Sequence, residues 1–166
     1  MQETEEDRAR EARLRRAIYA GSDQMYVHVT EPCSYMDGIV LYQPQSGGPL
    51  QVNHLLEIKV REGLRLWKHK SLFLSEPKWC QAGIMYERHG IPTVVVYLLD
   101  DSIIWIDLSQ PEVRRGAYKA QYPVFHRKTG AKTYPMLIPA TRRTVRVFGM
   151  LSDESHRQIL AHHSDG

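Results

Sequence analysis

The segment that most constrains the fold is residues 93–99, an unbroken apolar run of mostly β-branched and aromatic side chains. It is much shorter than the roughly 20 residues that a membrane-spanning helix needs. Its composition favours a strand. A strand that is apolar on both faces belongs in the middle of a sheet that is covered on both sides. The chain is therefore predicted to be an α/β protein.

The elements around this strand follow from local signals. Ser75 suits a helix N-cap, Pro77 suits the first turn, and Gly90 suits the stop, which together predict a helix over residues 75–89. Acidic residues at the start of an arginine-rich stretch predict another helix over residues 5–19. Alternating or β-rich stretches predict strands over residues 25–30, 38–42, 51–61, 93–99 and 103–108. The expected architecture is a mixed central sheet flanked by helices.

The length of 166 residues, with 42% hydrophobic and 25% charged residues, fits one globular unit. We divide it into a core (1–108), a basic extension packed on or near the core (109–151) and a flexible tail (152–166). Short strands are expected in the extension over 122–125, 136–138 and 144–148, whereas residues 64–74 give no clear structural signal.

Location is predicted from the N-terminus and the cysteines. Residues 1–16 are polar and charged, unlike a secretory signal, so an intracellular, cytoplasmic protein that does not span a membrane is expected. Cys33 and Cys80 are too few for a disulfide framework or a thiolate zinc site. Both are expected to be reduced, with Cys80 in the core.

The net charge is only +3, but its distribution is uneven. Between residues 111 and 150 a single acid, Glu112, faces nine lysines and arginines: Arg114, Arg115, Lys119, Arg127, Lys128, Lys132, Arg142, Arg143 and Arg146. Such a field attracts a polyanion, and nucleic acid is the common one inside cells. A merely solvated surface is the alternative.

The segment 54–60 carries the chemistry. Alternate residues of a strand share a face, so Glu57 and Lys59 project together while Leu56 and Ile58 point to the other side. Asp37 stands twenty residues before Glu57, at the start of the preceding strand, and the turn between them brings that strand back beside Glu57. Two carboxylates can converge there, and Mg²⁺ binds to one or two carboxylates together with waters and phosphate oxygens. A lysine beside them can hold a nucleophilic water or balance charge on phosphorus.

Asp37, Glu57 and Lys59, with their spacing and the order of elements, resemble the pattern of the PD-(D/E)XK, or restriction-endonuclease-like, nucleases over about residues 5–108. Met36 stands where these nucleases often have proline. The resemblance implies that Asp37 and Glu57 bind a divalent metal, that the carbonyl of Ile58 assists, and that Lys59 serves the attacking water. A surface Glu/Lys pair on an edge strand, with an aspartate in a turn, is the structural alternative.

Within that superfamily, size and layout are most similar to the archaeal-type Holliday junction resolvases, and phage-encoded relatives would accommodate the long C-terminal part. The resemblance implies that a first-helix glutamate joins the metal site; Glu11 is the candidate by spacing, with Glu6 as second choice. The same acids could instead serve only the helix dipole. Gln81 is the candidate for a glutamine that touches the site from the helix after the lysine strand.

Together with the residues described above, the resemblance implies a Mg²⁺-dependent DNA endonuclease, with Mn²⁺ as a substitute, that acts on branched DNA as a homodimer. The DNA backbone would be held by first-helix and extension arginines: Arg13, Arg16, Arg142, Arg143 and Arg146. The dimer contact is expected around Tyr97, Ile104, Trp105 and Ile106. The alternatives are a catalytically silent nucleic-acid-binding protein of the same fold, a non-junction nuclease, and a metal-dependent hydrolase of a small phosphate. Phosphate-loop, dinucleotide-binding, serine-hydrolase and HExxH motifs are absent from the sequence.

Overall fold

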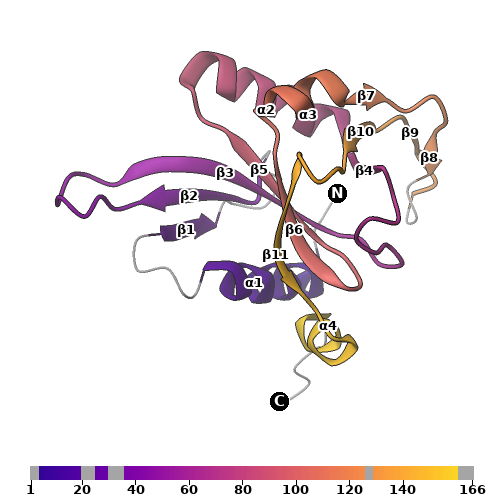
Figure 1. Cartoon of the computed structure of the whole chain (residues 1–166), viewed down its shortest axis with the longest axis horizontal. Helices are drawn as coiled ribbons and strands as arrows, with labels where there is room; N and C mark the ends of the chain where they lie inside the picture. The colour runs from indigo at the N-terminus through magenta and orange to yellow at the C-terminus, as the bar shows by residue number, and fades with distance from the viewer. Residues whose placement is uncertain (1–3, 20–24, 30–35, 126–128, 161–166) are drawn as a thin grey trace.

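A computed structural model describes residues 4–19, 25–29, 36–125 and 129–160 of the chain. Its centre is a six-stranded sheet with the order β1-β2-β3-β5-β6-β11 (Figure 1). The strands are β1 (Met25–Val29), β2 (Gly38–Tyr42), β3 (Gln51–Val60), β5 (Thr93–Leu98), β6 (Ser102–Asp107) and β11 (Val145–Met150). The pair β3–β5 is parallel, and the other pairs are antiparallel. The predicted mixed sheet with flanking helices is confirmed.

The parallel pair results from a crossover through β4 (Ser71–Leu74) and α2 (Glu76–His89). A proline lies in the first turn of α2, and Gly90 ends the helix with φ 65°, a left-handed conformation that glycine adopts without strain. Every residue of β5 is buried, as its apolar sequence predicts.

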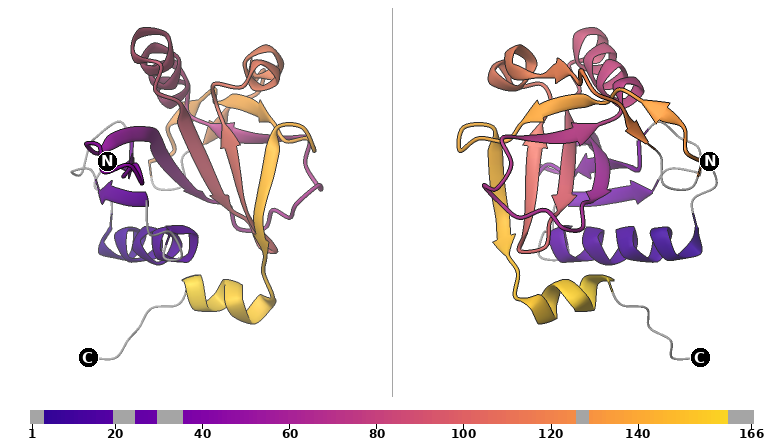
Figure 2. Two further views of the ribbon diagram at one scale, coloured as in Figure 1. Left: turned by 60° about the vertical axis from the view of Figure 1, so that its left-hand side comes forward. Right: turned by 90° about the vertical axis from the view of Figure 1, so that its right-hand side faces the viewer.

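Helix α1 (Glu5–Tyr19) covers one face of the sheet. Leu14 and Ile18 of this helix pack against Leu56 and Ile58 of β3. Helix α4 (Asp153–Leu160) lies beside α1 (Figure 2), and Arg13 Nε donates a hydrogen bond to the Ile159 carbonyl at 2.6 Å. Residues 153–160, which the sequence analysis assigns to a flexible tail, are therefore a helix, because α1 gives this amphipathic segment a surface to pack on.

The opposite face is covered by α2, by α3 (Pro111–Gly116) and by a second sheet in the order β4-β10-β7. Its other strands are β10 (Met136–Pro139) and β7 (Tyr118–Lys119). Leu72, Leu74 and Ile138 of this sheet are buried in the core. Beyond it, β8 (Val124–Phe125) and β9 (Lys132–Thr133) form a two-stranded ladder. The segment 64–74 thus ends in a strand whose partner comes from more than sixty residues further along the chain.

The C-terminal part of the chain contributes strands to both sheets, β11 to the six-stranded sheet and β10 to the three-stranded sheet. Strand β11 pairs with β6, with Val145 opposite Ile106, so β6 is an interior strand. The predicted dimer contact is wrong for this reason: Tyr97, Ile104 and Ile106 are buried, and the Trp105 ring faces Phe148 of β11 at 6.5 Å.

Two further features concern the surface of the molecule. Cys80 is exposed, contrary to expectation, because α2 turns Ala82 rather than Cys80 toward the core. Within the described residues, no helix is both long and apolar enough to cross a membrane.

Candidate active site

Glu57 is the centre of a charged cluster on the face of β3 that is covered by α2 and β4. Its side chain is only 1% exposed, and Oε1 lies 2.5 Å from Lys59 Nζ, two residues along the same strand. Leu56 and Ile58 belong to the core on the α1 side. The strand alternation predicted for this segment is therefore confirmed. The burial of Glu57 was not predicted, because it results from α2 and β4, which cover this face of β3.

Asp37, immediately before β2, forms hydrogen bonds with the two residues of β3 that flank Glu57. Its backbone N–H donates to the Leu56 carbonyl at 2.9 Å, and its Oδ2 accepts from the Ile58 N–H at 2.7 Å. The antiparallel register continues this contact with Gly38 opposite Leu56. Asp37 and Glu57 are thus brought together by main-chain geometry, which orients the aspartate independently of any flexible side chain.

Lys78 is a member of the cluster that sequence reasoning missed. It lies in the first turn of α2, and its Nζ donates to Glu57 Oε2 at 2.8 Å. No spacing rule connects it with Glu57, since the contact depends on how α2 crosses the sheet. The signal that could have found it is a lysine near the start of the helix that follows the Glu57 strand.

Opposing influences act on the charge of Glu57. Burial raises the pKa of this carboxyl, Lys59 lowers it, the nearby negative charge of Asp37 raises it, and Lys78 lowers it. Oε1 is buried, and its partner is the ammonium group of Lys59. Two carboxylates and two ammonium groups therefore share one small region, and each pair reduces the cost of burying the other.

Arg61 and Tyr97 connect this cluster with the second sheet. Arg61 continues the Glu57 and Lys59 side of β3, and its Nη2 donates to the Phe73 carbonyl of β4 at 3.2 Å. The Tyr97 hydroxyl donates to the same oxygen at 3.2 Å. Burial lowers the pKa of Arg61, while Tyr97 and Glu57 raise it. These bonds hold β4 over the site.

The donor set fits a hard divalent cation. The carboxylates of Asp37 and Glu57 and the carbonyl of Ile58 are oxygen donors, and the hydrogen bonds between Asp37 and β3 hold them close together. Among the described residues there is no cluster of three or more His, Cys, Asp or Glu side chains that could hold a metal. A site with two carboxylates suits Mg²⁺, which keeps several waters and also takes phosphate oxygens.

The other predicted site residues lie elsewhere. Glu11 pairs with Arg15 at 3.5 Å and Glu6 with Arg10 at 2.8 Å, all on α1, which covers the sheet face opposite to Glu57. The structure does not group either acid with Asp37 and Glu57. Gln81 is partly buried on α2, one helical turn after Lys78, so it lies on the side of the helix that carries this lysine.

The predicted DNA-binding arginines are divided between two regions. Arg13 donates a hydrogen bond to the Ile159 carbonyl and so connects α1 to α4, while Arg16 is exposed on α1. The extension arginines Arg142, Arg143 and Arg146 are exposed. Arg142 lies over the ring of Trp67 at 5.1 Å, and this half-exposed tryptophan has a positive φ of 63°.

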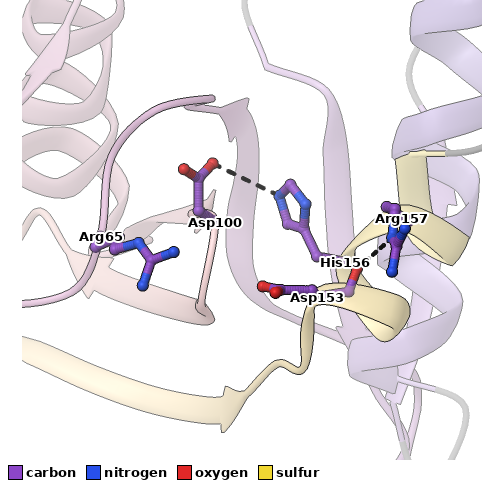
Figure 3. A pocket seen from close by; sticks show the side chains of 5 residues that line it. All are labelled: Arg65, Asp100, Asp153, His156 and Arg157. Carbon is purple, nitrogen blue, oxygen red and sulfur yellow. Dashed lines mark hydrogen bonds and ion pairs between the residues drawn. The ribbon is translucent and has the colours of Figure 1, made fainter.

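A pocket of about 270 Å³ lies between α4 and the turn that joins β5 to β6 (Figure 3). Its lining is charged, and His156 Nε2 lies 3.9 Å from Asp100 Oδ1. The residues around it are Arg65, Asp100, Asp153, His156 and Arg157. None of them belongs to the Glu57 cluster, so this pocket is separate from the candidate active site.

Comparison with known families decides the class of the protein. Residues 1–120 match the model of a family described as "Phage putative PDDEXK endonuclease". The chain belongs to this family. The matched region contains Asp37, Glu57, Lys59 and Lys78 and covers more than half of the 166 residues. Comparisons with curated proteins and with solved structures find no significant match.

Membership makes the chain a PD-(D/E)XK endonuclease, a hydrolase that acts on nucleic acid, and confirms the predicted resemblance to the PD-(D/E)XK nucleases. Endonucleases of this superfamily generally use divalent metal ions, in agreement with the donor set described above. The match ends at residue 120, so β8 to β11 and α4 lie outside the region that the family model describes.

Proposed function

We propose that this endonuclease hydrolyses DNA phosphodiester bonds with Mg²⁺, for which Mn²⁺ can substitute. Asp37, Glu57 and the Ile58 carbonyl would hold the cation. The observation that carries the proposal is a pair of hydrogen bonds: Asp37 N–H donates to the Leu56 carbonyl, and Ile58 N–H donates to Asp37 Oδ2, so that this carboxylate is held beside the buried carboxylate of Glu57. When bound, the cation supplies Lewis-acid activation of the phosphate and of water.

The lysines have separate roles in this proposal. Lys59, on the same strand as Glu57 and 25% exposed, can hold the attacking water and balance charge that builds up on the phosphate. Lys78 approaches Glu57 from α2, and both lysines favour the ionised form of Glu57, the form that a metal requires. The exposed arginines Arg16, Arg142, Arg143 and Arg146 are available for DNA phosphates.

For the substrate, we propose branched DNA, with a four-way junction preferred as by a resolvase. A junction requires two cuts related by a two-fold axis, whereas the described residues of one chain contain one Asp37, Glu57 and Lys59 cluster. A homodimer would supply the second. Because the β5–β6 surface is inside the fold, such a dimer would have to use other residues.

A gel assay tests this function with duplex, single-strand, flap and four-way-junction DNA of shared sequence in parallel. Mg²⁺ and Mn²⁺ should support cutting, and the junction should be cut fastest. Light scattering should give twice the mass of one chain. A monomer that cuts duplex and junction equally would remove the resolvase role and leave the endonuclease.

Replacing Lys78 should change the metal requirement. In Lys78→Met the positive charge 2.8 Å from Glu57 Oε2 is removed, which raises the pKa of Glu57 further, so half-saturation with Mg²⁺ should need roughly tenfold more metal. Cleavage rates measured over a Mg²⁺ titration give this value, with Lys68→Met, an exposed lysine in the loop after β3, as the control. An unchanged or lowered Mg²⁺ requirement would contradict the role of Lys78 in keeping Glu57 ionised for the metal.

A further inference from the structure

The outer face of the second sheet carries aromatic side chains in register. Phe73 of β4 pairs with Leu137 of β10, and Leu137 pairs with Tyr118 of β7, so the three side chains lie in a row across one face. Phe73 is 40% exposed and Tyr118 is 55% exposed, whereas their neighbours Leu72, Leu74 and Ile138 turn into the core. This row is therefore an apolar surface open to solvent.

The row continues along a long hairpin that leads away from the core. After β7 and β10, the Ala120 N–H donates to the Pro135 carbonyl at 2.8 Å, and β8 and β9 then pair at the outer end (Figure 1). Tyr122 is 81% exposed and Phe125 is 63% exposed. Tyr134, on the returning strand, is also exposed. Large aromatic side chains so open to water are typical of an interaction surface.

Charge indicates the kind of partner. Residues 118–139 contain four lysines and arginines and no acidic residue. Lys132 Nζ lies 5.6 Å from the centre of the Tyr134 ring, so basic and aromatic groups are interleaved. Basic side chains match phosphates, and exposed rings stack on bases that are not paired, a combination typical of surfaces that bind single-stranded nucleic acid.

The aromatic surface is joined to the active site through two contacts. The Phe73 carbonyl accepts the hydrogen bonds of Arg61 and Tyr97, and Arg61 comes directly after β3, the strand that carries Glu57 and Lys59. Lys119 Nζ pairs with Glu76 Oε2 at 2.8 Å, at the start of the helix that carries Lys78. The elements that carry the aromatic surface are therefore the ones that also contact residues of the Glu57 cluster and its supporting helix.

We propose that Phe73, Tyr118, Tyr122, Phe125 and Tyr134 stack on bases that are unpaired at the branch point of the DNA substrate, so that the enzyme prefers branched DNA with accessible bases next to the cut over continuous duplex. The choice of DNA rests on the proposed function. The surface selects the substrate by the accessibility of its bases, and the exposed arginines contribute phosphate contacts that do not distinguish single-stranded from paired DNA.

The test measures DNA binding in EDTA, so that no cleavage occurs, by the fluorescence anisotropy of labelled oligonucleotides with the full chain. The probes are a single strand, the same strand with abasic sites, and a duplex. Tyr122→Ala/Phe125→Ala should weaken binding of the single strand roughly tenfold for each ring removed. Affinity for the duplex and for the abasic strand should stay within about twofold, because neither offers an unpaired base.

Controls separate stacking from folding. Tyr122→Phe/Phe125→Tyr keeps both rings and should bind like the wild type, as should Tyr86→Ala, which removes a 45% exposed ring from α2. The proposal would be overturned if Tyr122→Ala/Phe125→Ala lost affinity equally for the normal and the abasic strand, or if it lost no affinity at all. The proposal would also be overturned if this variant differed from the wild type in mass by light scattering but bound DNA with unchanged affinity. That result would assign the surface to contact with a second copy of the chain. If the variants lose affinity for the single strand as expected but the wild-type enzyme cuts no DNA with Mg²⁺, the aromatic surface is supported and the proposed function is contradicted.

Discussion

Asp37→Asn and Glu57→Gln are each expected to slow DNA cleavage by roughly a thousandfold or more, while DNA affinity stays within a few-fold. Stabilisation of transition-state charge by a metal is worth several kcal/mol, and each 1.4 kcal/mol changes the rate tenfold. The amide oxygen introduced by Asp37→Asn can still accept the Ile58 hydrogen bond that now reaches Asp37 Oδ2, so the strand contact should persist. Single-turnover cleavage and fluorescence anisotropy measure the two quantities.

Glu62→Gln is the matched control, because Glu62 is an exposed acid just after β3. It should cut like the wild type. Thermal melting of all three variants tests whether the fold is retained. Cutting near the wild-type rate by either Asp37→Asn or Glu57→Gln would place the active site elsewhere.

The second large effect is a loss of folding stability at acidic pH, which we expect to come from His54. Burial lowers the pKa of His54 to about 4, which outweighs the opposing effect of Asp107. The ring is held between the Tyr19 hydroxyl, 3.0 Å from Nε2, and Asn53 Oδ1, 2.6 Å from Nδ1. An unfolded histidine titrates near pH 6.5, so between this value and pH 4 the unfolded chain binds a proton that the folded chain does not. Stability is therefore lost as the pH falls through this window, by about 2–3 kcal/mol at pH 4.5.

Denaturant unfolding at pH 7.5 and pH 4.5 measures this loss. In His54→Gln the difference between the two pH values should shrink by about 2–3 kcal/mol, whatever the variant's stability at neutral pH. His89→Gln, at the exposed end of α2, should keep the wild-type difference. Parallel pH dependence in wild type and His54→Gln would show that another group controls acid unfolding.

Features encoded by neighbouring residues could be predicted from the sequence. The apolar run of β5 predicted a buried strand, and Ser75, Pro77 and Gly90 predicted the limits of α2 within a residue. The two-residue period of β3 placed Glu57 and Lys59 on one face. Asp37 could be placed beside them because a short turn returns the chain, so that β2 and β3 pair directly.

Features that depend on distant parts of the chain could not be predicted. Strand β4 is stabilised by β10, and β6 is covered by β11, both from the C-terminal part of the chain. These pairings buried the proposed dimer surface. Lys78 reaches Glu57 only because α2 packs on the face of the sheet that carries Glu57, and Glu11 is separated from Glu57 because α1 lies on the other face. Short polar strands and packed terminal helices carry weak local signals, so tertiary contacts decide their structure.

The most direct test of the metal-dependent, two-carboxylate centre uses closed-circular DNA with an inverted repeat that extrudes as a four-way junction, which an endonuclease can cut without a free end. Wild-type protein is incubated with this DNA in Mg²⁺, in Ca²⁺ and in excess EDTA. Nicked and linear products should form in Mg²⁺ and should not form in EDTA. Ca²⁺ should permit binding with little cutting, because its looser coordination does not impose octahedral geometry. Cleavage in excess EDTA at the rate seen with Mg²⁺ would contradict a centre in which Asp37 and Glu57 act by holding a metal.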